Sequence, residues 1–239
     1  MQTALLTVTH DISGKNIELY TELKSELEGL YSEIFITISD ESSLELIKVI
    51  EESNFKVKII PKNGAAHARR EVLKFGLEGN SKYFHYCDFD RILTWGKYYL
   101  NELKTVVLDV PNYDYQILGR SDRAIKTHPI EWIETEKITN KIFSLEFGRD
   151  VDITSGSCSF SKESAEYING YSKEKMTDSE WAMIIARIAK LQVDYKTVEG
   201  LEYHEEINSV DKEISDSDKW LRRLELSLII SRASMYTGK

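Results

Sequence analysis

Apolar, β-branched runs alternate with helical patterns through the first third of this 239-residue chain. Strands are predicted at Thr3–Thr9, Glu33–Ser39, Phe55–Ile60 and Lys82–Cys87, with amphipathic helices between them. Strands that alternate with helices in this way favour crossover connections and a mainly parallel central sheet flanked by helices. We therefore predict the α/β fold class, with ligands bound at the carboxyl ends of the strands.

The second half of the chain is less regular, but it continues to mix helices and strands. We predict helices over Trp95–Val106, 131–147, Thr177–Leu191 and Asp218–Met235, and strands over Tyr113–Arg120, Val151–Phe160 and Val193–Val198. No repeat, low-complexity segment or linker marks a boundary, and the chain has only three prolines. We therefore expect a single domain, residues 1–239, in which both halves share one sheet.

Two carboxylates, Asp88 and Asp90, directly follow the strand predicted at Lys82–Cys87. Oxygen ligands at such a strand end suit a hard divalent cation such as Mg²⁺ or Mn²⁺, which binds through one or two carboxylates, water and substrate phosphates. An acidic turn exposed to solvent is the alternative for this Asp-x-Asp, because short acidic turns are common on protein surfaces.

Composition excludes several classes of partner. The formal charge is −9, from 31 Lys and Arg against 40 Asp and Glu, so we expect no nucleic-acid partner. With only two cysteines, Cys87 and Cys158, a disulfide framework is not expected. No apolar run approaches the roughly 20 residues that span a bilayer, and the N-terminus has the pattern of a strand rather than a signal peptide. These features favour a cytoplasmic protein.

Three partial motifs occur in a fixed order, and together they resemble a known family. They are Ile38-Ser39-Asp40-Glu41-Ser42-Ser43 after the second strand, Asn63-Gly64-Ala65-Ala66-His67-Ala68-Arg69-Arg70 before a helix, and Asp88-Phe89-Asp90. This series resembles the GT-A fold of nucleotide-diphospho-sugar transferases, most closely the family-2-like glycosyltransferases. The resemblance covers residues 3–92 well and continues loosely to about residue 190. The second Arg of Arg69-Arg70 departs from the family's Arg-Asn.

The resemblance implies a metal-dependent glycosyltransferase that moves a hexose from a UDP- or GDP-linked donor to a hydroxyl of a small-molecule or glycan acceptor. Residues 1–110 would form the nucleotide-sugar-binding half and residues 111–239 the acceptor-binding half with a C-terminal helix. The implied donor-binding residues are Thr9, Asp40, Arg69, Asp88, Ser155 and Gly156. The implied ligands of Mg²⁺ or Mn²⁺ are Asp88, Asp90 and His204, and the implied general base is Asp178, with Glu180 as its alternative.

Structural roles remain open for several of these residues. Asp40 could cap the helix that begins near Ser42, Asp178 could complement a helix dipole, and a lone histidine such as His204 is more often a core or surface residue. Arg69 is expected to bind diphosphate oxygens with its guanidinium.

Two other functions also remain open, namely a sugar-phosphate nucleotidyltransferase and a non-catalytic GT-A-like scaffold. The loop His10-Asp11-Ile12-Ser13-Gly14-Lys15 carries one Gly and one Lys, few for the phosphate loop of a nucleotidyltransferase. We expect the C-terminal helix to pack on the sheet, with a homodimer contact or a peripheral membrane contact as alternatives.

Overall fold

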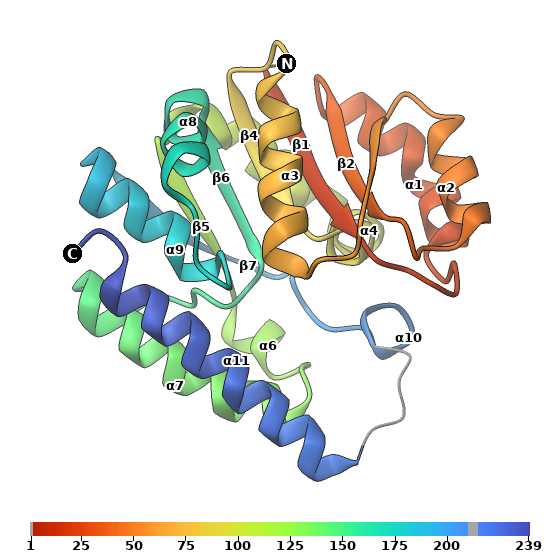
Figure 1. The fold of residues 1–239 in the computed structure, drawn as a ribbon. Coiled ribbons are helices and arrows are strands. Elements are labelled where there is room, and N and C mark those ends of the chain that lie inside the picture. Colours follow the sequence, from red (N-terminus) through yellow and green to blue (C-terminus); the bar gives the residue numbers. More distant parts are fainter. Residues whose placement is uncertain (1, 210–214) are drawn as a thin grey trace.

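A seven-stranded sheet forms the centre of the molecule in the computed structural model, which describes residues 2–209 and 215–239 (Figure 1). The strand order is β3-β2-β1-β4-β6-β5-β7. The strands are β1 (Thr3–Thr9), β2 (Ile34–Ser39), β3 (Lys56–Ile60), β4 (Tyr83–Cys87), β5 (Tyr115–Arg120), β6 (Ser157–Ser161) and β7 (Val193–Val198). All neighbouring pairs are parallel except those of β6, which runs antiparallel to β4 and β5. The predicted α/β class with a mainly parallel sheet is confirmed.

Strands β1 and β2 are mostly apolar and buried because helices cover both of their faces. Every residue of β2 is buried, as are the first five of β1. Leu5 lies in register with Ile34 on β2, and Leu6 with Tyr86 on β4. This register brings the carboxyl ends of β1, β2 and β4 to one edge of the sheet, where the predicted site residues follow them.

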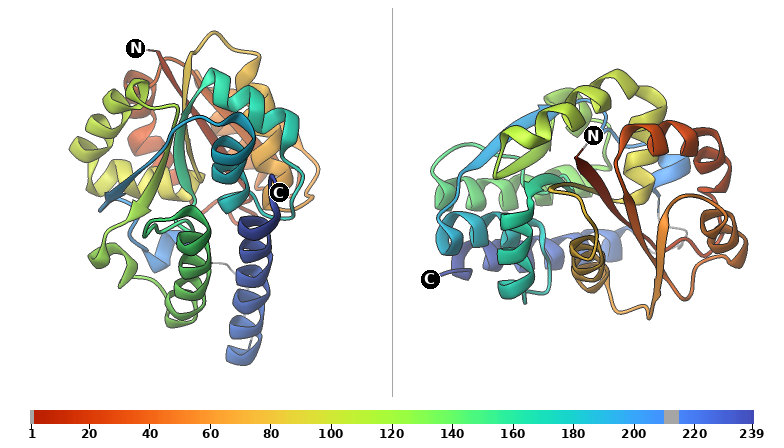
Figure 2. Two further views of the ribbon diagram at one scale, coloured as in Figure 1. Left: turned by 90° about the vertical axis from the view of Figure 1, so that its left-hand side faces the viewer. Right: turned by 90° about the horizontal axis from the view of Figure 1, so that it is seen from above.

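Helices form a layer on each face of the sheet (Figures 1 and 2). One layer contains α1 (Ile17–Leu30), α2 (Leu44–Glu51), α4 (Phe89–Tyr98) and α5 (Leu100–Asp109), whose apolar sides pack with Leu5, Ile36 and Ile38. The other contains α3 (Ala65–Leu77), α7 (Ile130–Phe147), α8 (Lys162–Tyr171), α9 (Asp178–Met183) and the π-helical turn η2 (Ile184–Ala189), packed with Leu6 and Phe84. Short segments η1 (Val110–Asn112), α6 (Asp122–Ile125) and α10 (Glu205–Asn208) connect these elements.

The last helix, α11 (Asp216–Tyr236), lies alongside α7 and also contacts α9 (Figure 1). Arg223 on α11 pairs with Glu136 on α7, and Ser227, one turn later on α11, pairs with Thr139, one turn later on α7. The two long helices therefore run in the same direction. Helix α11 therefore packs on α7 and α9 and not directly on the strands, which refines the prediction that it packs on the sheet.

Two predicted elements differ from the observed ones. The helix predicted over Trp95–Val106 is two helices separated at Tyr99, and the first of them begins directly after Asp88. Of the strand predicted over Val151–Phe160, only Ser157–Ser161 is a strand, because Asp152 turns inward to pair with Arg120 on β5. Because α4 begins directly after Asp88, Asp90 lies in the first turn of this helix and not on a separate acidic turn.

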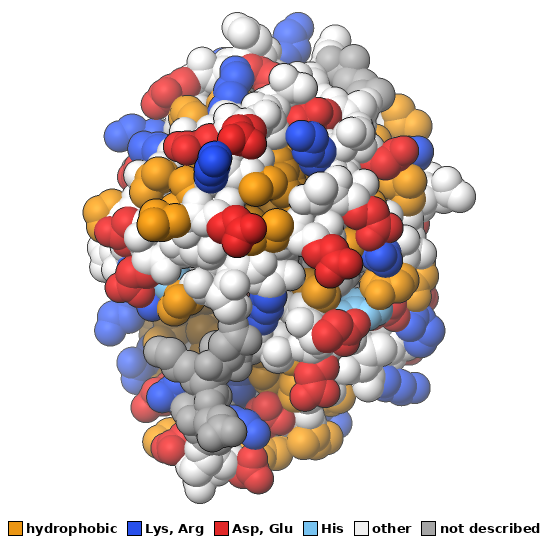
Figure 3. All heavy atoms as spheres, turned by 90° about the vertical axis from the view of Figure 1, so that its right-hand side faces the viewer, with side chains coloured by type: hydrophobic (Ala, Val, Ile, Leu, Met, Phe, Trp, Pro, Cys, Tyr) orange, Lys and Arg blue, Asp and Glu red, His pale blue; other side chains and the backbone are white. Residues whose placement is uncertain are grey.

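The cysteines and the charged side chains of the surface can now be located. Both cysteines are free and buried. Acidic and basic side chains are interspersed over the face shown in Figure 3, without a continuous basic tract. Within the described residues, no helix is both long and apolar enough to cross a bilayer.

Candidate functional site

A cleft with a volume of about 590 Å³ opens at the carboxyl ends of β1, β2 and β4. This volume lies within the range of roughly 300–1,000 Å³ that is usual for small-ligand sites. The walls come from the segment after β1 (residues 8–16), the end of β2 (Ser39), the segment 60–65 that leads into α3, and residues 207–209. Arg69, Asp88 and Asp90 also line the cleft, as does Thr9. The sheet thus brings four of the predicted site residues into one cavity.

Asp88 ends β4 and begins α4, where it is held by two neighbours. Its Oδ2 accepts a hydrogen bond of 3.0 Å from Arg69 Nη2, and its Oδ1 accepts one from the Tyr86 hydroxyl. The Arg69 guanidinium also lies over the Tyr86 ring, 5.4 Å from its centroid. Asp88 is therefore a fixed, ion-paired carboxylate at the floor of the cleft.

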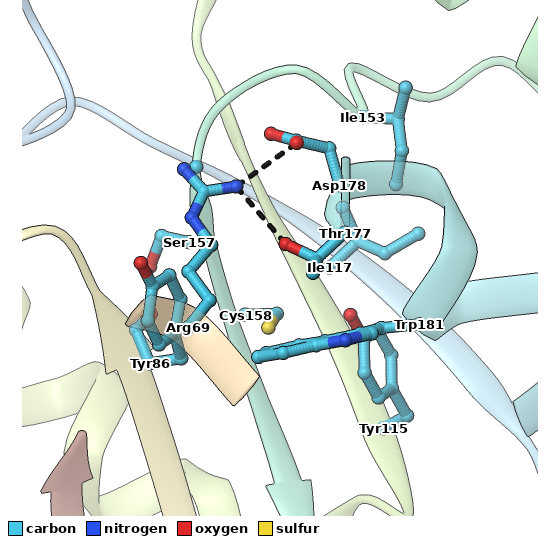
Figure 4. Close-up of a pocket in the computed structure, with 11 residues that line it drawn as sticks. Arg69, Tyr86, Tyr115, Ile117, Ile153, Ser157, Cys158, Thr177, Asp178 and Trp181 are labelled. Atoms are coloured by element: carbon cyan, nitrogen blue, oxygen red, sulfur yellow. Dashed lines mark hydrogen bonds and ion pairs between the residues drawn. The ribbon is translucent and has the colours of Figure 1, made fainter. Parts of the chain in front are cut away.

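Arg69 connects Asp88 to Asp178, which lies 109 residues further along the chain. Its Nη1 donates to Asp178 Oδ2 at 3.0 Å and to the Thr177 hydroxyl at 3.2 Å (Figure 4). Burial acts to lower the pKa of the Arg69 guanidinium, but the charges of Asp178 and Asp88 outweigh it and raise that pKa well above its usual value. Because both terminal nitrogens are engaged, Arg69 in this structure holds two carboxylates in place, which differs from the predicted role of gripping diphosphate.

A second, much smaller cavity lies beside the Arg69–Asp178 pair (Figure 4). Its volume of about 20 Å³ has room for about one water molecule. Aromatic side chains of Tyr86, Tyr115 and Trp181 form much of its wall. Trp181 is 2% exposed and packs against Phe160, so it is a core residue.

Asp90 differs from Asp88 because it forms no ion pair within the described part of the chain. Its Oδ2 accepts a hydrogen bond of 2.8 Å from the Asn208 side-chain amide. Burial raises the pKa of the Asp90 carboxyl, Arg91 opposes this shift, and the nearby charge of Asp88 adds to it. A half-buried carboxylate without an ion-pair partner among the described residues, on the wall of an open cleft, is suited to bind a cation.

The carboxylates of Asp88 and Asp90 suit Mg²⁺ or Mn²⁺, provided that the substrate supplies the remaining ligands. Among the described residues, no group of three or more His, Cys, Asp and Glu side chains could hold a metal by itself. Magnesium sites that serve phosphate chemistry commonly use only one or two protein carboxylates, with phosphate oxygens and water as the remaining ligands. Asp90 would be the direct ligand, with Asp88 beside it.

The geometry does not support His204 as a third metal ligand. Its imidazole stacks on Tyr98 with ring centroids 4.3 Å apart, and its Nε2 lies 2.9 Å from Glu202 Oε1 without the alignment of a hydrogen bond. His204 is not among the residues that line the cleft. Its backbone N–H instead donates to Asn208 Oδ1 at 2.8 Å, so His204 orients the amide that contacts Asp90.

Asp40 also lies outside the cleft lining, so its predicted contact with the nucleotide base is not supported. Its Oδ1 accepts a hydrogen bond of 3.0 Å from the backbone N–H of Lys62, which ties the end of β2 to the segment after β3. Ser43, not Asp40, caps helix α2 by accepting a hydrogen bond from the Leu46 N–H. Ser39, one position before Asp40, lines the cleft.

Asp11, in the loop after β1, also lines the cleft. It is 4% exposed, and its Oδ1 accepts backbone hydrogen bonds from Gly14 at 2.8 Å and Lys15 at 3.2 Å. Its Oδ2 accepts from the backbone N–H of Asn16 at 3.0 Å. Gly14 has φ +73°, a conformation that favours glycine and lets these amides converge on one carboxylate. Asp11 therefore fixes the shape of the loop after β1.

Ser155 and Gly156 lie near the ion-paired carboxylates but outside the larger cleft. The Ser155 hydroxyl donates to the Leu118 carbonyl at 2.6 Å, so it is used within the fold and is not presented to a sugar. Gly156 has φ +74°, and a Cβ there would lie 3.3 Å from Asp88 Oδ2. Glycine at this position allows the loop before β6 to approach Asp88 closely.

The surroundings of Glu180 do not favour its predicted role as the alternative base. It is fully buried, and its Oε1 accepts hydrogen bonds from the backbone N–H groups of Lys173 and Glu174, the latter at 2.7 Å. Its Oε2 accepts from the Ser172 hydroxyl. With both oxygens engaged inside the protein, Glu180 anchors the segment that precedes α9. Asp178, two residues earlier on this helix, lines the smaller cavity and bonds Arg69, which itself lines the cleft.

Asn208 is a residue of the candidate site that no motif in the sequence singles out. It is 6% exposed, it donates to Asp90, and its Oδ1 accepts from the His204 backbone and, at 3.4 Å, from Arg91. The amide can adopt only one orientation with these partners, because Nδ2 must face a carboxylate and Oδ1 must face donors. Asn208 thereby fixes the position of Asp90 from 118 residues away.

No family model and no curated relative matches the chain at the level of sequence. Solved structures match in fold. Glucosyl-3-phosphoglycerate synthase from Mycobacterium tuberculosis, in complex with Mn²⁺, UDP-glucose and phosphoglyceric acid, matches with TM-score 0.55 and 12% identity over 97% of this chain and 79% of that chain. The same synthase with Mg²⁺ and UDP matches with TM-score 0.54 and 11% identity over 96% and 79%.

A 4-diphosphocytidyl-2C-methyl-D-erythritol synthase from Anaerococcus prevotii matches over 94% of this chain and 97% of its own at 9% identity, but its TM-score of 0.48 is too low to bear on function.

The strand order is 3-2-1-4-6-5-7 with β6 alone antiparallel, and the fold is similar to that of glucosyl-3-phosphoglycerate synthase. This chain has the GT-A fold of the nucleotide-diphospho-sugar transferases.

Proposed function

We propose that this protein is a metal-dependent glycosyltransferase that moves a hexose from a UDP- or GDP-linked donor to a hydroxyl of a small molecule or glycan. The observation that carries the proposal is Asp90, a half-buried carboxylate without an ion-pair partner among the described residues, on the wall of a cleft of about 590 Å³. Asp88, already neutralised by Arg69, lies beside it. The fold neighbour whose structure contains UDP-glucose and Mn²⁺ supports the same donor class.

The cleft has two features that suit a diphosphate. The first turn of the 13-residue helix α3 lies at the cleft wall, where Gly64 and Ala65 contribute to the lining. Backbone N–H groups at a helix N-terminus favour an anion. Gly64 has φ +81° and no side chain, so a phosphate can approach the backbone closely there. Asp90 would hold the cation on the other side of the diphosphate.

A bound divalent cation would supply charge neutralisation for the departing nucleoside diphosphate. The residues of the chain would set the geometry around it. Asn208 holds one oxygen of Asp90, Arg69 and Tyr86 hold Asp88, and Asp11 shapes the loop that forms the far wall of the cleft. Each of these partners is fixed before substrate binds, which is what a preorganised site requires.

Asp178 is our candidate general base for an inverting transfer. It would take the proton of the acceptor hydroxyl as that oxygen attacks the anomeric carbon. Replacing it with asparagine should lower turnover by about 10²- to 10⁴-fold, the usual contribution of a positioned base, while donor binding persists. The readout is kcat. Turnover within threefold of wild type would exclude Asp178 as the base.

The loop after β1 favours glycosyl transfer over nucleotidyl transfer. A nucleotidyltransferase would use backbone amides and basic side chains of this loop for phosphate. Here the N–H groups of Gly14, Lys15 and Asn16 already bind the protein's own Asp11 carboxylate. They are therefore not available to a substrate anion without displacing Asp11.

A product assay distinguishes these functions. Purified protein is incubated with UDP- and GDP-hexoses and Mn²⁺ or Mg²⁺, with a panel of hydroxyl acceptors, and both the nucleotide product and pyrophosphate are measured. The proposal predicts release of UDP or GDP that depends on metal and on acceptor. Sugar phosphates and nucleoside triphosphates are the matched control, and pyrophosphate release from them would instead identify a nucleotidyltransferase. Donor binding without any product would indicate a non-catalytic scaffold.

A further inference from the structure

After its last strand, the chain returns from the edge of the sheet to the two carboxylates of the cleft. Strand β7 is an outermost strand, and β5 and β6 separate it from β4. The segment that follows β7 crosses this distance, and its short helix α10 contacts α4, the helix that begins after Asp88 (Figure 1). Asn208, the last residue of α10, thereby reaches Asp90 and donates its side-chain amide to Oδ2 at 2.8 Å.

The position of Asn208 is itself fixed by hydrogen bonds. Its backbone N–H donates to the His204 carbonyl at 2.7 Å, and its Oδ1 accepts from the His204 N–H at 2.8 Å. Arg91 Nη1 donates to the same Oδ1 at 3.4 Å and to the Glu202 carbonyl at 2.9 Å. Because Oδ1 faces these donors, Nδ2 is the group that faces Asp90, and the amide cannot exchange its two ends without losing these contacts.

The carboxylate oxygens of Asp88 and Asp90 consequently differ in what they can offer a cation. Asp88 Oδ2 accepts a hydrogen bond from Arg69 at 3.0 Å, and Asp88 Oδ1 accepts one from the Tyr86 hydroxyl. Asp90 Oδ2 accepts from Asn208. Within the described ranges 2–209 and 215–239, no side chain donates to Asp90 Oδ1. A cation can therefore approach this oxygen without competing with a side-chain donor.

We propose that Asn208 selects the cation of the site by restricting Asp90 to one ligating oxygen, an inference that rests on the proposed metal-dependent function. Ca²⁺ takes about six to eight oxygen ligands in a flexible arrangement, often with both oxygens of one carboxylate. Mg²⁺ requires near-ideal octahedral geometry and keeps several waters, with one or two carboxylates as its protein ligands. A carboxylate that offers a single oxygen, held in place by an amide, therefore suits Mg²⁺ or Mn²⁺ and denies Ca²⁺ a two-oxygen contact.

A purely structural role of Asn208 predicts a different result. If Asn208 only anchored α10 to α4, its loss would weaken nucleotide binding to the same extent with every cation. A residue that selects the cation instead changes the ratio between the affinities measured with different cations. Hydrogen-bond partners of metal ligands typically contribute about 10- to 100-fold to metal affinity, so the change in this ratio should be large enough to measure.

Calorimetric titration with UDP and GDP, each in saturating Mn²⁺, Mg²⁺ or Ca²⁺, tests the proposal. Wild-type protein should bind at least one of the nucleotides about tenfold or more tightly with Mn²⁺ or Mg²⁺ than with Ca²⁺. Asn208→Ala releases Asp90 Oδ2, so the affinity with Mn²⁺ should fall by about 10- to 100-fold. The affinity with Ca²⁺ should fall less, because Asp90 can then offer both oxygens, and the two affinities should converge.

Two further variants complete the comparison. Asn208→Asp keeps the size of the side chain and an oxygen for the His204 N–H, but it turns a second carboxylate towards Asp90. The nucleotide should therefore bind more tightly with Ca²⁺ in this variant than in the wild type. Glu205→Ala is the matched control, because Glu205 is exposed on the same helix and does not line the cleft, and it should keep the wild-type ratio between Mn²⁺ and Ca²⁺.

The results separate this inference from the function on which it rests. If the wild type binds nucleotide with Mn²⁺, and the ratio between Mn²⁺ and Ca²⁺ is unchanged in the Asn208 variants, the inference about Asn208 is overturned and the proposed function stands. If the wild type shows no cation-dependent binding of either nucleotide, the proposed function is overturned together with this inference. Converging affinities in Asn208→Ala, with the wild-type ratio in Glu205→Ala, would support the role of Asn208.

Discussion

Replacing Asp90 with asparagine should stabilise the protein while abolishing its metal-dependent binding of nucleotide. Burial raises the pKa of the Asp90 carboxyl above its usual value of 3.8. The unfolded chain therefore releases this proton at a lower pH than the folded chain, so ionisation of Asp90 opposes folding at neutral pH. Asparagine has no charge to bury, and its oxygen can still accept the hydrogen bond from Asn208.

Each 1 kcal/mol that Asp90→Asn adds to the free energy of unfolding should raise the melting temperature by about 2–4 °C. The difference between Asp90→Asn and wild type should shrink as the pH falls through the raised pKa of folded Asp90, and it should vanish below 3.8, where Asp90 is protonated in both states. Asp88→Asn is the matched control: Asp88 is ion-paired with Arg69, so its neutralisation should lower the melting temperature. The account is contradicted if Asp90→Asn melts below wild type at neutral pH without metal.

Replacing Arg69 with methionine should produce the largest loss of stability. Methionine fills much of the same space but leaves Asp88 and Asp178 without their cation, and the Asp178 side chain is only 7% exposed. Removing one partner from a buried ion pair typically destabilises a protein by about 3–5 kcal/mol. The melting temperature should therefore fall by roughly 6–20 °C at 2–4 °C per kcal/mol, and turnover should be lost.

The neighbouring Arg70→Met variant provides the comparison for this second prediction. Arg70 is 28% exposed, it bonds the Ser172 hydroxyl at 2.9 Å and the Glu174 carbonyl, and it forms a longer ion pair of 3.6 Å with the buried Glu180. Arg69 is 8% exposed and pairs with two carboxylates at 3.0 Å. Because Glu180 keeps its own three hydrogen bonds without Arg70, the loss in Arg70→Met should be smaller, about 1–2 kcal/mol. Denaturant titration measures both variants. If Arg70→Met destabilises the protein as much as Arg69→Met, Arg69 does not have the central role assigned to it.

The first half of the fold was predictable because local patterns determine it. Strands β1 to β4 agree with the predicted strands to within about two residues, since buried parallel strands are mostly apolar and the helices between them repeat every three or four residues. The region 151–156 was not predictable, because a distant ion pair between Asp152 and Arg120 and the left-handed Gly156 override its strand-like pattern.

The same distinction holds for the site. Asp88 and Asp90 follow a strand directly, so their place at the sheet edge could be predicted from the chain. The partners that give them different roles could not, because Arg69 contacts Asp178 across 109 residues and Asn208 contacts Asp90 across 118. Asp178 and Glu180 look equivalent in sequence, but residues two apart on a helix point to different sides, and only the fold shows which side faces Arg69.

The most direct test of the account is a thermal-shift measurement with UDP, GDP and their hexose conjugates, each with Mn²⁺ and with a chelator. Ligand at a hundredfold excess over Kd contributes about 2.7 kcal/mol, or roughly 5–11 °C for a chain of this size. The account predicts a rise of this order with at least one of these ligands, present with Mn²⁺, absent with chelator and absent in Asp90→Asn. Equal shifts with and without metal, or an undiminished shift in Asp90→Asn, would contradict it.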